Sequence, residues 1–202
     1  MATKKKPRTR TKARSVKKAR AMARTKAKTT ARPARKAKKA ARRKTAAAAP
    51  KSAIRSLPAV EVATTSGKTL RLSELRGKPV IIYFYPKDDT PGCTTEGCDI
   101  RDNWEAFTRL DAVVLGVSRD SLESHERFKA KYGFPFELVS DGDEKLCRLF
   151  GVIKEKSLYG KKYVGVERST FVFDRGGALR REWRGVKVPG HVQEVLAEVQ
   201  GL

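Results

Sequence analysis

The positive charge of this chain is concentrated in its first 51 residues. That segment holds 22 Lys and Arg side chains and no Asp or Glu, whereas the other 151 residues hold 24 basic and 22 acidic side chains. The segment also contains no aromatic residue, Leu or Ile, so it cannot bury enough apolar surface to offset the entropy lost on folding. The sequence therefore predicts a disordered polybasic tail over 1–51. One folded domain of about 150 residues, long enough to enclose a hydrophobic core, is expected over 52–202.

The tail is built from Ala-Lys and Ala-Arg units broken by Thr and Pro, a composition similar to the C-terminal tails of linker histones and to histone-like bacterial proteins. A flexible polybasic segment binds nucleic acid by neutralising phosphates, with little sequence preference and strong salt dependence. We therefore expect the tail to contact DNA. The alternative is a solvated tail with no specific partner, or an arm that binds any polyanion. The basic residues expected to bind lie in its densest cluster, which comprises Lys36, Lys38, Lys39, Arg42, Arg43 and Lys44.

An organelle presequence is another interpretation of the tail. Presequences normally present an apolar face, and here only Ala, Val16 and two Met are available. No stretch of the chain is apolar enough for a signal peptide or a membrane span. The three cysteines, an odd number, fit a reducing compartment better than a secreted disulfide framework. A cytoplasmic, nucleoid-associated location without a membrane partner is expected, with organelle targeting as the alternative.

Beyond the tail, apolar runs alternate with amphipathic patterns. Strands are expected at 80–84, 112–117, 170–173 and 179–183, and helices at 94–110, 122–132, 144–150 and 192–199. The segment 174–177, Asp-Arg-Gly-Gly, is typical of a hairpin turn that joins the last two strands. Strands that alternate with helices, followed by an antiparallel pair and a closing helix, indicate an α/β domain of three layers.

Two cysteines, Cys93 and Cys98, follow the buried-strand pattern at 80–84. Gly92 permits a tight turn, and the residues after Cys93 suit the first turn of a helix. Cys93 is therefore expected at or just inside a helix N-terminus, where the partial positive charge of the backbone N–H groups favours a thiolate. Thr90, three residues earlier, can direct its hydroxyl at the sulfur and at a bound oxygen substrate.

The spacing of the two cysteines carries a second inference. Five helical residues advance about 7.5 Å and rotate the second side chain roughly 140° from the first. A disulfide needs Cα atoms closer than about 7 Å, with Cβ atoms that face each other. If Cys93 and Cys98 join, the first turns of the helix must unwind. The sequence thus predicts a folded reduced state and a locally unfolded oxidised state.

The stretch 84–99, with Pro86-x-x-x-Thr90-x-x-Cys93 inside it, and the later stretch 165–174 closely resemble the bacterioferritin comigratory protein, or Q-type, branch of the peroxiredoxins. The resemblance covers about 54–202. It implies a thioredoxin-like fold, in which helices flank a central mixed sheet. It also implies a thiol-specific peroxidase that needs no cofactor. Such an enzyme reduces hydrogen peroxide and organic hydroperoxides to water and alcohols, and relatives are often monomeric.

The same resemblance implies roles for individual residues. Cys93 would be the peroxidatic thiol that becomes a sulfenic acid, and Cys98 the resolving thiol that condenses with it to a Cys93–Cys98 disulfide. Thioredoxin or a similar dithiol would then reduce this disulfide. Thr90 would orient the substrate, and Arg168 would pair with the thiolate and the peroxide. A guanidinium suits this task because its planar donors hold two partners at once and stabilise charge on the leaving oxygen.

Two positions depart from the family pattern. Ile153 stands where many relatives carry Trp, and Leu158 where many carry Met. Neither side chain is reactive, so these departures concern packing rather than mechanism.

Plainer interpretations exist for each candidate residue. The two cysteines could be small buried hydrophobes, and Arg168 could be an exposed strand residue in a surface ion pair. Asp88 and Asp89 resemble a carboxylate dyad, but adjacent loop carboxylates point apart and more often cap turns, so no chemistry is assigned to them. A protein that compacts nucleic acid, with an incidental peroxiredoxin domain, is the alternative function.

The remaining potential ligands are Cys147, His125 and His191. They are scattered without the close pairs that metal sites use, so no metal site is expected. Cys147 lies on the apolar face of a short helix pattern and is interpreted as a core thiol. His125 is expected to face solvent, and His191 to lie at a helix start, with neither in reach of Cys93.

Overall fold

A computed structural model describes residues 53–158 and 161–202 of the protein. The predicted basic tail, with its cluster of six Lys and Arg residues, lies outside the described residues. Within them the elements in chain order are β1 (Glu61–Thr64), β2 (Thr69–Arg71), the 3-10 helix η1 (Leu72–Leu75), β3 (Val80–Phe84), α1 (Pro91–Asp102), α2 (Trp104–Arg109), β4 (Val113–Ser118), α3 (Leu122–Tyr132), β5 (Glu137–Ser140), α4 (Lys145–Leu149), β6 (Ile153–Leu158), β7 (Lys161–Val166), β8 (Ser169–Phe173), β9 (Leu179–Arg184) and α5 (His191–Val199).

Seven strands form one mixed sheet in the order β2-β1-β5-β4-β3-β8-β9. The neighbours β3, β4 and β5 are parallel, whereas β8 joins β3 and β9 joins β8 in antiparallel register. All five residues of β3 are buried, which explains its unbroken apolar sequence, because a central strand is covered on both faces.

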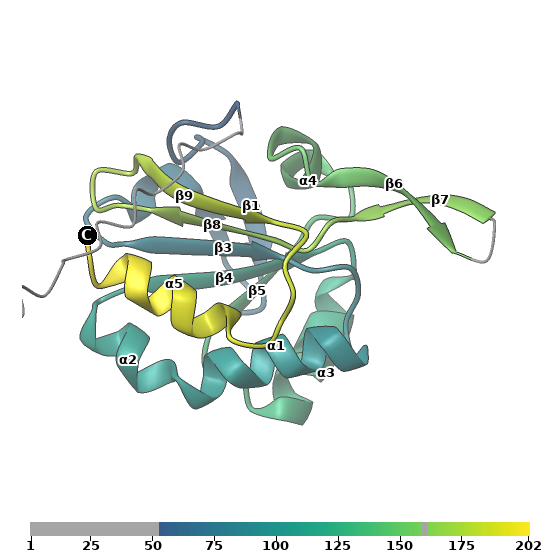
Figure 1. Ribbon diagram of the computed structural model, residues 1–202, viewed down its shortest axis with the longest axis horizontal. Coiled ribbons are helices and arrows are strands. Elements are labelled where there is room, and N and C mark those ends of the chain that lie inside the picture. The colour runs from purple at the N-terminus through teal and green to yellow at the C-terminus, as the bar shows by residue number, and fades with distance from the viewer. Residues whose placement is uncertain (1–52, 159–160) are drawn as a thin grey trace, which may run out of the picture. The chain divides into compact units, whose positions relative to one another are not determined.

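Successive side chains of β3 enter two different cores, as the two-residue period of a strand requires. Ile81 and Tyr83 belong to an apolar cluster that also contains residues of α1, α2, α3 and α5. Ile82 and Phe84 belong to a second cluster with residues of α4. Figure 1 shows the corresponding layers, with α1, α2, α3 and α5 on one side of the sheet and α4 on the other. The three-layer α/β prediction is confirmed.

One long helix was expected at 94–110, and this prediction is wrong in detail. The structure has two helices, α1 and α2, that meet at Asn103 (φ −104°, ψ 13°). The Asn103 side-chain amide donates to the carbonyl oxygen of Asp99 at 2.7 Å. This bond gives the backbone a local alternative to the continued helix, so α1 ends here and α2 leaves in a new direction.

Five strands were not predicted: β1, β2 and β5, which have three or four residues each, and the pair β6 and β7. The last two form a separate antiparallel sheet, which projects from the central sheet in Figure 1. Their sequences are rich in Lys and lack a clear apolar alternation, so no pattern marked them. Ile153, at the start of β6, packs against the second core cluster; the side chain of Leu158 is not described.

The last part of the domain follows the prediction. β8 and β9 form the expected hairpin, and in its turn the Gly177 N–H donates to the carbonyl oxygen of Asp174 at 2.8 Å. α5, the last helix, begins at His191, one residue earlier than expected, and its apolar face lies in the first core cluster. Among the described residues, no helix combines the length and apolar character needed to span a membrane.

Candidate active site

Cys93 is the third residue of α1 and is 3 % exposed. The helix begins at Pro91, whose missing N–H costs nothing at a first helical position, and Thr90 precedes it in an extended conformation. The first turn closes when the Thr94 N–H donates to the carbonyl oxygen of Thr90 at 2.9 Å. The predicted position just inside a helix N-terminus is confirmed, and the partial positive charge of that end favours an anionic sulfur.

Arg168 reaches the same helix end from the short link between β7 and β8. Its Nη2 donates to the Cys93 sulfur at 3.3 Å, its Nη1 donates to Glu96, and its side chain is 14 % exposed. The alternative of an exposed surface ion pair is therefore wrong. A Cβ atom added at Gly92 would lie 3.2 Å from Nη2, so a glycine at this position leaves the guanidinium room beside the sulfur.

Glu96 completes this group, although the sequence analysis assigned it no functional role. It lies one helical turn after Cys93 and is 1 % exposed, and its Oε1 atom has no hydrogen-bond partner in the described part of the protein. Burial raises the pKa of Glu96 to about 7, because the loss of water outweighs the attraction of Arg168. The available sequence signal was its i+3 spacing, which places it on the same helix face as Cys93.

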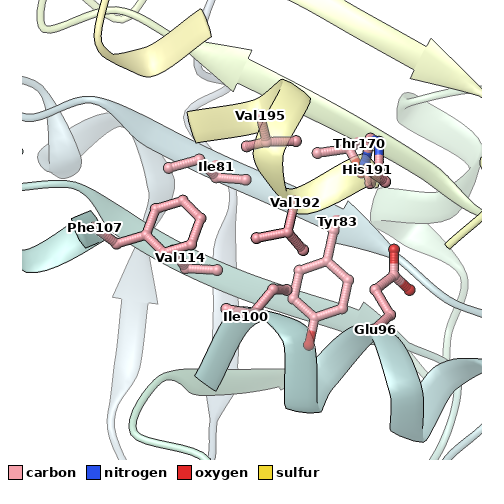
Figure 2. Close-up of a pocket in the computed structure, with 10 residues that line it drawn as sticks. All are labelled: Ile81, Tyr83, Glu96, Ile100, Phe107, Val114, Thr170, His191, Val192 and Val195. Atoms are coloured by element: carbon pink, nitrogen blue, oxygen red, sulfur yellow. The ribbon is translucent and has the colours of Figure 1, made fainter. Parts of the chain in front are cut away.

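A small pocket, lined in part by Glu96, lies between α1, α5 and the sheet (Figure 2). Its lining is mostly aliphatic and aromatic, with Thr170 and His191 among its few polar members. Thr170 Oγ1 and His191 Nε2 are 2.7 Å apart, and burial lowers the pKa of His191 to about 4, which keeps the ring neutral near pH 7. The free space is about 10 Å³, enough for one water at most, so a peroxide must reach Cys93 from another side.

Thr90 and Cys98 are the other two predicted site residues. The Thr90 hydroxyl donates to the carbonyl oxygen of Lys87 at 3.0 Å, and its role in orienting a substrate stays a prediction. Cys98 is partly buried on α1 and packs against the cluster that contains Cys93. Both cysteines are free thiols in this helical state; the disulfide between them stays a prediction.

Residues 54–182 match the AhpC/TSA family. Peroxiredoxin Bcp of Bacillus subtilis is 50% identical over 145 residues, which cover 72% of this chain and 92% of that protein. Peroxiredoxin Q of Suaeda salsa chloroplasts is 40% identical over 146 residues, 72% of this chain and 66% of that protein. The solved structure of the Xanthomonas campestris bacterioferritin comigratory protein matches with a TM-score of 0.69 and 49% identity, covering 73% of this chain and 97% of that one.

The chain is a peroxiredoxin. It belongs to the Bcp and peroxiredoxin Q branch of the AhpC/TSA family, as its motifs indicated, and it is a thiol peroxidase. The match to solved structures of this branch also confirms the thioredoxin-like fold.

The structure corrects one prediction beside the site of this peroxiredoxin. His125, expected to face solvent, is completely buried, and its Nδ1 lies 2.9 Å from an oxygen of Asp88. Asp88 is buried as well. Burial by itself would raise the pKa of Asp88, but hydrogen bonds from His125, Ser124 and Tyr85 outweigh it and lower that pKa. Sequence periodicity missed this pair because its members are far apart along the chain.

Cys147 is also completely buried, as predicted, but in the core cluster on the other face of the sheet from Cys93. Burial raises the pKa of its thiol well above the usual value, and the neighbouring Asp141 adds to the effect. Cys147 is therefore an unreactive core thiol in the folded peroxiredoxin. No group of three or more His, Cys, Asp or Glu residues suited to a metal ion occurs within 53–158 and 161–202.

Proposed function

We propose that Cys93 is the peroxidatic thiol of this peroxiredoxin. Its thiolate sulfur attacks one oxygen of the hydroperoxide, and the O–O bond breaks as the S–O bond forms. Cys93 is oxidised to a sulfenic acid, and the other oxygen leaves as an alcohol or as water after it takes up a proton.

The observation that carries this proposal is the 3.3 Å contact between Arg168 Nη2 and the Cys93 sulfur at the N-terminus of α1. A partly buried guanidinium stabilises the attacking thiolate in the ground state. As negative charge moves to the leaving oxygen, the same group can stabilise it without reorganisation. Thr90 is proposed to hold the attacked peroxide oxygen against the sulfur.

Cys98 is the proposed resolving thiol. It attacks the sulfur of the sulfenic acid, water leaves, and a Cys93–Cys98 disulfide forms after the first turns of α1 unwind. A dithiol of the thioredoxin type then reduces the disulfide by exchange. The Xanthomonas relative was studied for alkyl peroxide reduction, which supports alkyl hydroperoxides, besides hydrogen peroxide, as substrates of this chain.

Two variants test these roles. Cys93→Ser is expected to abolish peroxide reduction with thioredoxin as donor. Cys98→Ser is expected to consume one equivalent of peroxide and then stop as the sulfenic acid, which mass spectrometry detects as a gain of one oxygen on the peptide that contains Cys93. Continued turnover by Cys93→Ser, or an oxidised wild-type protein without a Cys93–Cys98 linkage, would contradict the proposal.

For the tail, we propose binding to DNA through its phosphates. The support is the segregation of charge in the sequence, with 22 basic and no acidic residues in the first 51 positions. Deletion of 1–51 should abolish retardation of DNA in a gel, and retardation by the full chain should weaken steeply with salt. Cys93→Ser should still bind DNA. Salt-insensitive retardation, or retardation that survives the deletion, would contradict this role.

A further inference from the structure

The loop that joins β3 to α1 is held by a helix that contributes nothing to the site itself. Asp88 in this loop accepts hydrogen bonds from Tyr85 at 2.8 Å and from Ser124 at 2.7 Å. It also faces His125 Nδ1 at 2.9 Å. Ser124 and His125 belong to α3, so Asp88 ties the loop to that helix through two side chains.

His125 extends the connection to the sheet. Its Nε2 lies 3.1 Å from the carbonyl oxygen of Val139 in β5, and the side chain is completely buried. Both ring nitrogens therefore lie within hydrogen-bond distance of oxygen atoms, those of the Asp88 carboxylate and the Val139 carbonyl. The histidine holds the loop at a set distance from β5.

The next residue, Asp89, is held by the same helix. It has a left-handed backbone conformation, with φ 52°, which is unfavourable for most residues other than glycine. Its carboxylate accepts from Lys131 Nζ at 2.6 Å and from the Tyr132 hydroxyl at 2.6 Å. Asp88 and Asp89, the two residues directly before Thr90, thus both accept hydrogen bonds from side chains of α3.

We infer that Asp88 and His125 are positioning residues for peroxide reduction, which hold the loop so that Thr90 and Cys93 keep their geometry beside Arg168. The inference rests on the proposed role of Cys93. Neither residue has a hydrogen bond to Cys93 or Arg168 among the described contacts, and they act through Asp89, the one residue that separates Asp88 from Thr90. The carbonyl oxygen of Thr90 in turn closes the first turn of α1.

The hydrogen bonds that hold Asp88 and Asp89 also have a consequence for the oxidised state. When α1 unwinds to form the disulfide, the side chains that hold Asp88 and Asp89 lie on α3 and directly after β3 rather than on α1. The loop therefore stays in place and unwinding begins after Thr90. After reduction, the sulfur returns to the same position without a search by the whole loop.

The test compares Asp88→Ala, Asp88→Asn and, as a surface control on α3, Glu123→Gln. Two rates are measured on full-length protein that is folded at the assay temperature. The first is the second-order rate of hydrogen peroxide reduction, followed by tryptophan fluorescence. The second is the rate at which iodoacetamide alkylates Cys93, followed by mass spectrometry. Alkylation needs a reactive sulfur but not the alignment of a peroxide with Thr90 and Arg168.

Asp88→Ala is expected to slow peroxide reduction at least about tenfold, since small misplacements of reacting groups are costly, and to leave alkylation within about twofold. Asp88→Asn should stay within about threefold in both rates, because its amide oxygen can accept from Tyr85 while its NH2 group donates to the Ser124 hydroxyl, which can also accept. Glu123→Gln, which removes only an exposed pair with Arg127, should match the wild type in both.

A folded Asp88→Ala protein with wild-type peroxide reduction, or one in which both rates fall equally, would overturn the positioning role. If Asp88→Ala does not fold, Ser124→Ala, which removes one hydrogen bond to Asp88, replaces it. That variant must then show a smaller loss confined to peroxide reduction, and an unchanged rate would overturn the role. Peroxide reduction by Cys93→Ser would instead overturn the proposed function itself.

Discussion

Arg168 serves two acidic groups with one guanidinium. Nη2 donates to the Cys93 sulfur and Nη1 to the carboxyl group of Glu96. Because burial raises the pKa of Glu96 to about 7, this carboxyl group is partly protonated near neutral pH. The positive charge of Arg168 is then less compensated by Glu96 and acts more strongly on the sulfur.

Arg168→Lys should lower the second-order rate of peroxide reduction about 100-fold, the scale of losing one well-placed donor to a developing oxyanion. A lysine keeps the charge but cannot hold Glu96 and the sulfur with two parallel donors. Stopped-flow fluorescence measures the rate. Arg180→Lys is the matched control and should react like the wild type, because Arg180 forms an exposed ion pair with Asp174 at 3.7 Å. A rate for Arg168→Lys within threefold of wild type would show that charge alone suffices.

At the scale of elements, α1 carries both cysteines and Glu96, and the proposed disulfide requires it to unwind. Unwinding exposes Glu96 to water, where its pKa returns from about 7 to its usual 4.5. Below pH 4.5 Glu96 is protonated in both states, and its contribution to the stability of the folded helix is fully present. This contribution, about 3 kcal/mol for such a pKa difference, is lost as pH rises towards and through the pKa of Glu96 in the folded helix.

Disulfide formation after peroxide oxidation should therefore speed up as pH rises from about 5 to about 8, and part of this gain should come from Glu96. Glu96→Gln has no carboxyl group to titrate at this position, so its rate should lose this part of the pH dependence. The measurement is the rate of the second fluorescence phase at each pH. Identical pH profiles for the wild type and Glu96→Gln would rule out the linkage.

Gly97 limits how α1 packs. A Cβ atom at this position would lie 2.5 Å from the end of the Phe134 ring, and that ring is stacked on Phe136 inside the aromatic cluster. An alanine gains about 1 kcal/mol of helix propensity, but overpacking of a filled core costs about 1–3 kcal/mol. Gly97→Ala should therefore lower the free energy of unfolding by about 1 kcal/mol, measured by urea denaturation. An increase would mean that Phe134 moves aside freely.

At the scale of the whole molecule, the described residues contain the complete seven-stranded sheet and both apolar clusters. Residues 52–202 carry a net charge of only +2. Folding and peroxide chemistry are therefore assigned to this part of the chain, and the proposed DNA binding to the tail.

Deletion of 1–51 should leave the melting temperature within about 2 °C and the peroxidase rate within about twofold, because the deleted segment supplies no apolar side chains larger than Val and Met. Calorimetry and the thioredoxin-coupled assay test this expectation. A large loss of stability would show that the tail packs against the domain.

Much of this site was readable from local sequence. The apolar run of β3, the turn at Gly92 and the cysteine that follows it all act within a few residues, so Cys93 could be placed at a helix N-terminus without a structure. The turn between β8 and β9 is equally local. The role of Arg168, in contrast, came from a family resemblance, since residue type alone favoured an exposed surface pair.

Contacts between residues far apart in sequence were decided by the tertiary structure alone. Arg168 meets Cys93 across 75 positions, and Asp88 meets His125 across 37. No periodic pattern specifies such pairs, because they depend on which strands become neighbours in the sheet. Burial is likewise decided by the tertiary structure. The sequence shows that Glu96 is acidic, but only the packing of α1 against the sheet removes the water around its carboxyl group and thereby changes its proton affinity.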